Sequence, residues 1–129
     1  MLDTDVCVEL IRGRGARIEH RMAQCGPAAL CISAITLAEL EVGVEKSHKY
    51  SKNRDALDEF CVLFDVLDFG RDAANEYGRV RAKLESRGKI IGGMDLLIAA
   101  HCLAEGATLV TNNTREFSRV EGLRVENWS

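Results

Sequence analysis

The sequence has few of the features that break, disorder or extend a chain. It contains a single proline among its 129 residues, aromatic side chains make up only 5%, and apolar side chains make up 47%. This composition excludes a collagen-like, mucin-like or disordered protein, and the length suits one globular unit. We therefore expect one folded domain that spans residues 1–129.

Long hydrophobic runs are also missing. No apolar run is longer than Leu96–Ala100, which falls far short of the roughly 20 residues that a membrane-spanning helix needs.

The sequence also lacks a large excess of charge, because 17 basic and 20 acidic residues give a net charge of −3. We expect no contact with membranes, and a polyanionic partner would have to be bound by a local basic patch.

Cysteine and histidine do not form a metal-binding pattern. The five cysteines include no Cys-x-x-Cys pair, and no histidine lies three or four residues from a cysteine or from another histidine. Since this spacing supports neither a zinc site nor a disulfide framework, we expect buried free thiols in the reducing cytoplasm. The cysteines are Cys7, Cys25, Cys31, Cys61 and Cys102.

Helical and strand-like segments alternate along the chain. Apolar residues recur at the spacing of amphipathic helices in four segments, at residues 18–25, 37–44, 57–64 and 73–84. Short apolar runs indicate strands at residues 29–32, 66–67, 108–111 and 123–125. Because parallel strands need crossovers that are usually helical, we predict an α/β fold with a central parallel sheet of four to five short strands flanked by helices.

One predicted helix is apolar nearly all round, which places it in the interior. It spans residues 94–104, and its first turn contains a single charged residue, Asp95. A buried charge needs a partner or a ligand. Asp95 is therefore the acidic residue that a purely structural role explains least well.

Acidic residues follow the predicted strands. Asp3 follows a first strand that is either clipped or continues further upstream, since only Met1 and Leu2 precede it. Glu39 lies in the first turn of the helix after the second predicted strand, Asp95 opens the interior helix, and Glu116 follows the fourth strand by a few residues. In open parallel sheets, ligands bind beyond the carboxyl ends of the strands. We expect the four carboxylates to meet there.

Three of these acids also have structural explanations. Asp3, or Asp5 beside it, can cap the helix that follows. Thr36 and Glu39 fit a capping box, and Glu116 can be an exposed turn residue. These alternatives remain open at the level of the sequence.

Crowded carboxylates repel one another, so one of them takes up a proton unless a cation is present. Ligation by carboxylates alone favours Mg²⁺, with Mn²⁺ as the alternative. Such an ion can activate a water molecule for in-line attack on a phosphodiester. The acidic residues therefore predict a nuclease site.

Two basic segments could hold a polyanion. Four arginines against one glutamate give residues 12–21 a net charge of +3, and residues 79–89 carry a net charge of +4. Arg14, Arg17 and Arg21 are spaced to share one helical face, and we expect them, with Arg12, to contact nucleic acid phosphates. Each segment could equally be a solvated helix surface.

The acidic motifs resemble those of one family. In their order and intervals they are similar to PIN-domain toxins, the VapC ribonucleases of bacterial toxin–antitoxin pairs, and the resemblance runs to the closing residues 125–128. The motifs are Met1–Asp5, Ser33–Leu40, Gly92–Ala99 and Thr111–Phe117.

The resemblance implies a PIN-type fold and a Mg²⁺-dependent endoribonuclease that acts on RNA, with tRNA as one candidate. It also implies a homodimer that is silenced by a VapB-type antitoxin. Asp3, Glu39 and Asp95 match the three principal acidic positions of the family, and Glu116 matches a fourth, more variable one.

Three further positions match supporting residues of the family. Thr111 is the polar residue that helps hold a ligand or water, and Asn112 and Asn113 orient neighbouring groups. Asp5 stands where the family usually has Asn, which adds a negative charge to the site.

Two other functions fit parts of the pattern. A receiver-type signalling module would also have acids after its first strand, but it needs a lysine after a late strand, and residues 108–115 contain none. A catalytically silent PIN-fold module that only binds a protein partner is the other alternative. The intact acidic positions argue against it.

Overall fold

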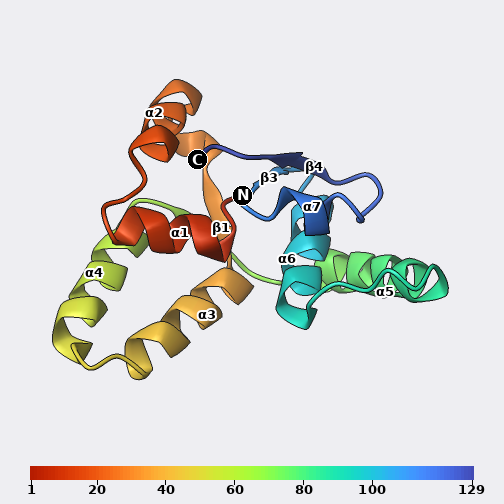
Figure 1. Cartoon of the computed structure of the whole chain (residues 1–129), viewed down its shortest axis with the longest axis horizontal. Coiled ribbons are helices and arrows are strands. Elements are labelled where there is room, and N and C mark those ends of the chain that lie inside the picture. Colours follow the sequence, from red (N-terminus) through yellow and green to blue (C-terminus); the bar gives the residue numbers. More distant parts are fainter.

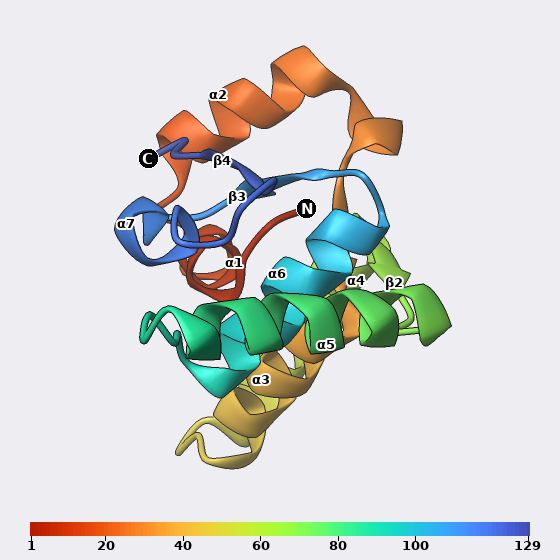
Figure 2. The ribbon, with the colours of Figure 1, turned by 90° about the vertical axis from the view of Figure 1, so that its right-hand side faces the viewer.

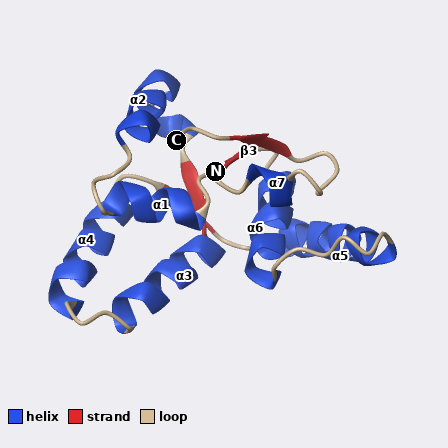
Figure 3. Ribbon diagram, in the orientation of Figure 1, coloured by secondary structure: helices blue, strands red, loops and turns tan.

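The structure is a computed structural model that describes residues 1–129 apart from the side chain of Pro27. Short parallel strands lie between helices, as Figures 1 and 3 show. Strand β1 (Cys31–Ser33) pairs with β2 (Asp65–Leu67), and β3 (Thr108–Val110) pairs with β4 (Arg124–Glu126). Both pairs are parallel, as the alternation of helices and strands predicts.

The amino-terminal residues join the two pairs of strands. The Leu2 amide donates to the Cys31 carbonyl at 2.9 Å, and the Asp3 amide donates to the Val110 carbonyl at 2.9 Å. Leu2 also forms a parallel bridge with Val110. The order across the molecule is therefore β2, β1, residues 1–3, β3 and β4. This confirms the α/β class and its four to five short parallel strands, and Asp3 lies in the middle of the arrangement.

Helices cover both sides of the strands. Figure 1 shows α1, α3 and α4 grouped on one side and α5 and α6 on the other, and Figure 2 shows α5 lying across α6. The helices are α1 (Thr4–Ile11), α2 (Ala16–Cys25), α3 (Ala34–Glu45), α4 (Tyr50–Val62), α5 (Arg71–Ser86), α6 (Gly93–Ala104) and α7 (Thr114–Phe117), with a 3₁₀ turn η1 (Pro27–Ala29).

Each side has its own apolar core. Val6, Ile32 and Leu57 belong to the cluster under α1, α3 and α4. Leu96 and Leu109 belong to the cluster under α5 and α6. Apolar burial drives the packing of both layers, and Asp3 lies on the line of strands between them.

The prediction of an interior helix is confirmed by α6. Five of its apolar residues are buried, and His101 is buried with them. The His101 ring nitrogen Nδ1 lies 2.7 Å from the Ser33 hydroxyl oxygen. Asp95, in the first turn, is half-buried.

Two local expectations are wrong. The segment predicted as a strand at residues 29–32 begins with the 3₁₀ turn, so the strand starts at Cys31. Thr36 does not cap α3, because the helix begins earlier: Ser33 is the cap, and its hydroxyl accepts from the Ile35 amide at 3.0 Å. Thr36 is the third residue of the helix and is buried in its first turn.

The cysteines are free, as expected, but only Cys7 and Cys102 are buried. Cys25 is exposed in the last turn of α2. The buried residue of this helix is Ile18, near its other end. Among the described residues, no helix is long and apolar enough to cross a membrane.

Candidate active site

Asp3 is both a helix cap and a buried acid. It is only 4% exposed, and it precedes α1 as the N-cap residue. Its Oδ1 accepts from the Thr4 amide at 2.8 Å, and its Oδ2 accepts from the Thr111 hydroxyl at 2.7 Å. The capping explanation is therefore correct for Asp3, and it does not exclude a place in the site, since the same carboxylate faces Thr111 across the strands.

Glu39 is held by a neighbouring helix. It lies in the second turn of α3, one turn later than expected, because α3 begins at Ala34. The Thr4 hydroxyl donates to its Oε1 at 2.6 Å, and the same hydroxyl lies 3.2 Å from the Thr36 hydroxyl. The start of α1 therefore fixes the carboxylate of Glu39 as well as that of Asp3.

Asp95 and Glu116 flank Gly92. The Gly92 amide donates to Oε1 of Glu116 at 2.9 Å, and the Asn113 side-chain amide donates to Oε2 at 2.5 Å. A Cβ atom at Gly92 would lie 3.6 Å from Oδ2 of Asp95 and 3.8 Å from Oε1 of Glu116. Glu116 belongs to α7 and is half-buried. It is therefore not an exposed turn residue.

The acids influence one another electrostatically. Burial, which is the largest cause, and the charges of Glu116, Glu39 and Asp5 together raise the pKa of Asp95 to about 6. Burial also raises the pKa of Asp3 to about 7 against the lowering effect of the Thr111 hydrogen bond, with Asp5 and Asp95 adding to the increase. The structure therefore brings all of the predicted acids into one cluster.

Asp5 and Asn112 form the edge of this cluster. Oδ1 of Asp5 accepts from the Val6 amide at 2.7 Å, and Oδ2 accepts from the Asn112 amide at 3.3 Å. Burial raises the pKa of Asp5. The Asn112 side chain turns away from the cluster and donates to Oε1 of Glu9 at 2.7 Å.

Three residues of the site are missing from the sequence prediction. Thr4 holds Glu39, Gly92 lies between two carboxylates, and Glu9 orients Asn112. Only Glu9 has a signal in the sequence, because it follows Asp5 by four residues on the same helix. The roles of Thr4 and Gly92 depend on tertiary packing.

The cluster fits a hard divalent cation. Its donors are carboxylate oxygens. The pKa values of Asp3 and Asp95 are raised first by burial and then by neighbouring negative charges, which a cation would balance. Within the described residues, no three His, Cys, Asp or Glu side chains form a group that could hold a metal ion directly. A hard divalent cation that keeps several waters would need only one or two of the carboxylates as direct ligands.

Of the predicted RNA-binding arginines, Arg12 lines a groove together with Thr4 and Glu39, whereas the other three precede or belong to α2. Arg12 ends α1, so roughly 14 Å of helix separates it from Asp3 at the other end. The prediction that Arg14 shares a helical face with Arg17 and Arg21 is wrong, because Arg14 precedes α2, which begins only at Ala16. Figure 1 shows α2 above α1, beside the carboxyl end of the chain.

Arg21 already has partners at the carboxyl end of the chain. Its Nη2 lies 3.1 Å from Oε1 of Glu126, and its guanidinium lies 5.2 Å from the centre of the Trp128 ring. The arginines of α2 and the acidic cluster are therefore separate features of the molecule.

The chain matches known proteins over its full length. The PIN domain family matches residues 1–123. The tRNA(fMet)-specific endonuclease VapC of Shigella flexneri is 42% identical over 129 residues, covering 100% of this chain and 97% of the relative. Ribonuclease VapC2 of Rickettsia felis is 43% identical over 129 residues, covering 99% of this chain and 96% of the relative.

A solved structure shows the same fold. The crystal structure of VapBC2 from Rickettsia felis bound to a DNA fragment from their promoter matches with a TM-score of 0.95 at 42% identity, over 100% of this chain and 98% of that chain. The resemblance predicted from the four motifs is confirmed. The chain belongs to the PIN-domain family and, within it, to the VapC ribonucleases.

Proposed function

We propose that this endoribonuclease, acting as the toxin of a toxin–antitoxin pair, cleaves RNA at a site formed by Asp3, Glu39, Asp95 and Glu116. The observation that carries the proposal is their convergence: the charges of Glu116 and Glu39 add to the larger effect of burial in raising the pKa of Asp95 to about 6, and the charge of Asp95 adds to the raised pKa of Asp3. Convergence of this kind has no structural advantage, because like charges destabilise the fold. The whole chain, residues 1–129, would act as one PIN domain.

The enzyme is metal-dependent, and we propose Mg²⁺ as the ion, with Mn²⁺ as the alternative. Asp3, Asp95 and Glu116 would hold it, one or two of them directly and the rest through its water ligands, and Asp5, Thr111 and Asn112 would support them. When bound, the ion lowers the pKa of a water molecule and neutralises charge on the phosphate under attack.

The protein's own contribution is to fix the carboxylates. Thr111 and the Thr4 amide hold Asp3, the Thr4 hydroxyl holds Glu39, and the Gly92 amide holds Glu116. Fixed acceptors can orient a water molecule toward the phosphorus atom without reorganising during the reaction. Glu39 and Glu116 are suited to accept hydrogen bonds from that water.

We propose a tRNA as the substrate. The relative from Shigella flexneri is named for its specificity toward tRNA(fMet). Recognition of a folded RNA depends on its shape and on unstacked loop bases, so a small enzyme can select a tRNA by fitting one of its loops to the acidic cluster.

The antitoxin would be of the VapB type, and a groove beside the site suits a segment of it. Its polar lining includes Thr4, Glu39 and Arg12, and the rest consists mainly of apolar residues from α1, α3 and α4. An apolar groove that contains one carboxylate favours a segment with apolar side chains and a cation that reaches Glu39. We expect the toxin to act as a homodimer in the cytoplasm, where its RNA substrate is found.

Incubation with RNA tests the proposal. The protein and an Asp95→Asn control are incubated with total cellular RNA in Mg²⁺, in Mn²⁺ and in EDTA, and new RNA ends are mapped by sequencing. We expect defined cuts that need the metal and are lost in the control, whose folding is checked by circular dichroism.

Equal cutting by the Asp95→Asn protein would refute the assignment of the site. Binding to a co-expressed VapB-type protein without any cleavage would favour the catalytically silent module instead. Gel filtration of the co-expressed pair separates that outcome from simple inactivity.

A further inference from the structure

A basic pocket lies between α5 and the turn that follows α7. Arg79, Lys83 and Arg87 are spaced by four residues, so they share one face of α5 and its end. Arg119 faces them from the turn, and all four line the same shallow hollow of about 10 Å³, so a ligand larger than a water molecule would lie over it and not inside it. The apolar residues of its lining are buried, so such a ligand would meet the charged side chains around its rim.

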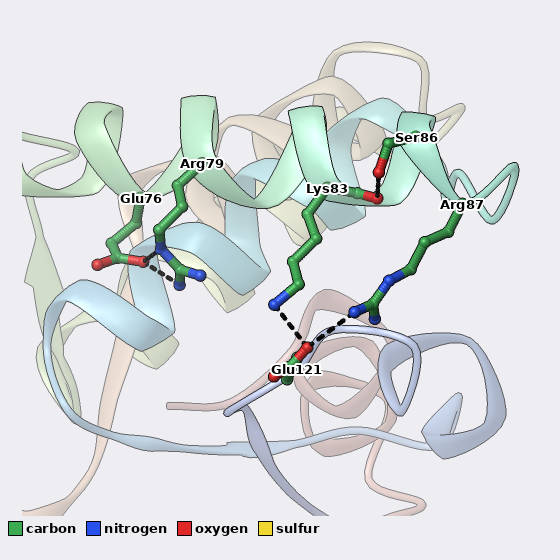
Figure 4. Close-up of polar contacts among 6 residues, drawn as sticks. All are labelled: Glu76, Arg79, Lys83, Ser86, Arg87 and Glu121. Atoms are coloured by element: carbon green, nitrogen blue, oxygen red, sulfur yellow. Dashed lines mark hydrogen bonds and ion pairs between the residues drawn. The ribbon is translucent and has the colours of Figure 1, made fainter.

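The pocket has more positive than negative charge. Figure 4 shows Lys83 and Arg87 both reaching Glu121, at 2.6 Å from Nζ and 3.3 Å from Nη2, respectively. Arg79 pairs with Glu76 at 2.6 Å. Four cations thus face two acids, although the chain as a whole carries a net charge of −3.

These ion pairs leave the cations available. The side chains of Lys83, Arg87 and Glu121 are 38%, 51% and 60% exposed, and solvent-exposed pairs of this kind stabilise a protein little. Glu121 presents one carboxylate to two cations, which is the arrangement that a phosphate group would adopt with its several oxygens. An external phosphate could therefore replace Glu121 at low cost.

The pocket adjoins the acidic cluster. The Arg119 guanidinium donates to the Ile90 carbonyl at 3.3 Å, and two residues later the Gly92 amide donates to Glu116 at 2.9 Å. Both bonds cross the same contact between α7 and the segment that leads into α6. A strand of RNA whose scissile phosphate lies at Asp95 and Glu116 could reach the pocket with a neighbouring part of its backbone.

We propose that Lys83, Arg87, Arg79 and Arg119 bind a backbone phosphate of the RNA substrate outside the scissile bond. This inference rests on the proposed function, because it assigns a second contact to the same substrate. A protein partner is a poorer fit, since protein interfaces are usually anchored by apolar or aromatic side chains, and the accessible lining of this pocket consists mainly of charged groups.

The test compares variants with opposite expected effects on RNA binding. Affinity for unfractionated tRNA is measured in EDTA, where no cleavage occurs, over a series of salt concentrations. We expect the double variant Lys83→Ala/Arg87→Ala to bind on the order of 10-fold more weakly, with a shallower dependence on salt because fewer phosphates are neutralised. Glu121→Gln should bind more tightly, by on the order of 3-fold, because it removes the competing carboxylate.

Glu121→Gln also provides the structural control, because it breaks the same ion pairs as the double variant. A merely structural role would weaken RNA binding in both proteins. Arg81→Ala is the matched charge control, since Arg81 lies on α5 but pairs with Glu85 outside the pocket, and its affinity should stay within about 3-fold of the wild type.

The proposal is overturned if the double variant binds tRNA as Arg81→Ala does, or if Glu121→Gln fails to strengthen binding. Loss of antitoxin binding with unchanged tRNA binding would overturn it as well, because the pocket would then serve a protein partner. Absence of RNA cleavage by the wild-type protein would instead refute the proposed function, so the two failures are distinguishable.

Discussion

The hydroxyl of Thr111 donates to Oδ2 of Asp3 across 2.7 Å, although the two residues are 108 positions apart in the chain. Both side chains are buried, and burial is the main cause of the raised pKa of Asp3, about 7, which the Thr111 bond opposes. Thr111 therefore keeps Asp3 closer to its charged form than burial alone would allow.

Replacing Thr111 by Val should make Asp3 harder to ionise. The variant keeps the shape of the side chain but loses the donor, so the pKa of Asp3 rises further. We expect RNA cleavage at neutral pH to fall by on the order of 10-fold, with the acidic limb of the pH–rate profile moving to higher pH. Thr111→Ser restores the donor and should restore the profile. An unshifted profile in Thr111→Val would contradict this role.

Thr4→Val should act through Glu39. The Thr4 backbone amide still donates to Asp3 in this variant, and the hydroxyl contacts with Glu39 and Thr36 are lost. We expect cleavage at saturating Mg²⁺ to be slower by on the order of 10-fold, with little change in folding stability. The variant is also made in a Glu39→Gln background, where it should have little further effect because the two residues act as a unit. Additive losses in that double variant would show that Thr4 acts elsewhere.

The positions of the acids could be predicted because each follows a strand or opens a helix. For Asp3 and Asp95, the order of the elements is enough to predict their position, because parallel strands end at the same edge of the sheet. Thr4 could not be predicted, because its contact with Glu39 depends on how α1 packs against α3. Gly92 gives no local signal at all: its importance comes from the two carboxylates on either side.

Local patterns misled where a competing residue lay nearby. Thr36 and Glu39 have the spacing of a capping box, but Ser33 caps the helix one turn earlier and Thr36 is buried. Arg14, Arg17 and Arg21 have helical spacing, but Gly13 and Gly15 flank Arg14, and α2 begins after them. In both cases the residues have helical spacing, but the helix begins at a different residue from the one that the spacing predicts.

Removing the charge of Asp95 should stabilise the metal-free protein. Its pKa of about 6 exceeds the ordinary value of 3.8, so the folded state retains a proton that the unfolded chain releases. The stability contributed by this proton is fully present below pH 4 and is lost as pH rises through 6. At pH 7.5 in EDTA, Asp95→Asn should melt about 3–5 °C higher, roughly 1 kcal/mol in a domain of this size, a modest value because Asp95 is half-exposed and solvent screens its charge.

Scanning calorimetry over pH checks this prediction. The difference in melting temperature between Asp95→Asn and the wild type should shrink as the pH falls below 6 and should be smallest below about pH 4, where Asp95 is protonated in both states. Adding Mg²⁺ should raise the melting temperature of the wild type more than that of the variant, because the ion binds the intact cluster. A variant that melts lower than the wild type at pH 7.5 would mean that Asp95 stabilises the fold.

Gly92→Ala should separate stability from activity. Gly92 has φ −55° and ψ 146°, a conformation that alanine adopts without strain, so the folding stability should stay equal or rise by about 0.4–1 kcal/mol. The new methyl group would contact Oδ2 of Asp95 at 3.6 Å and Oε1 of Glu116 at 3.8 Å. It would occupy space that water or a cation needs between the two carboxylates.

We therefore expect Gly92→Ala to need more Mg²⁺ for half-maximal cleavage and to cut RNA more slowly, by on the order of 10-fold. Gly93→Ala is the matched control, because a Cβ atom there meets nothing within 4 Å, and its Mg²⁺ dependence should equal that of the wild type. Titration of cleavage against Mg²⁺ for the two variants decides the matter. If both respond to Mg²⁺ alike, the space beside Gly92 is not where the ion or its waters bind, and Asp95 and Glu116 must hold them from another side.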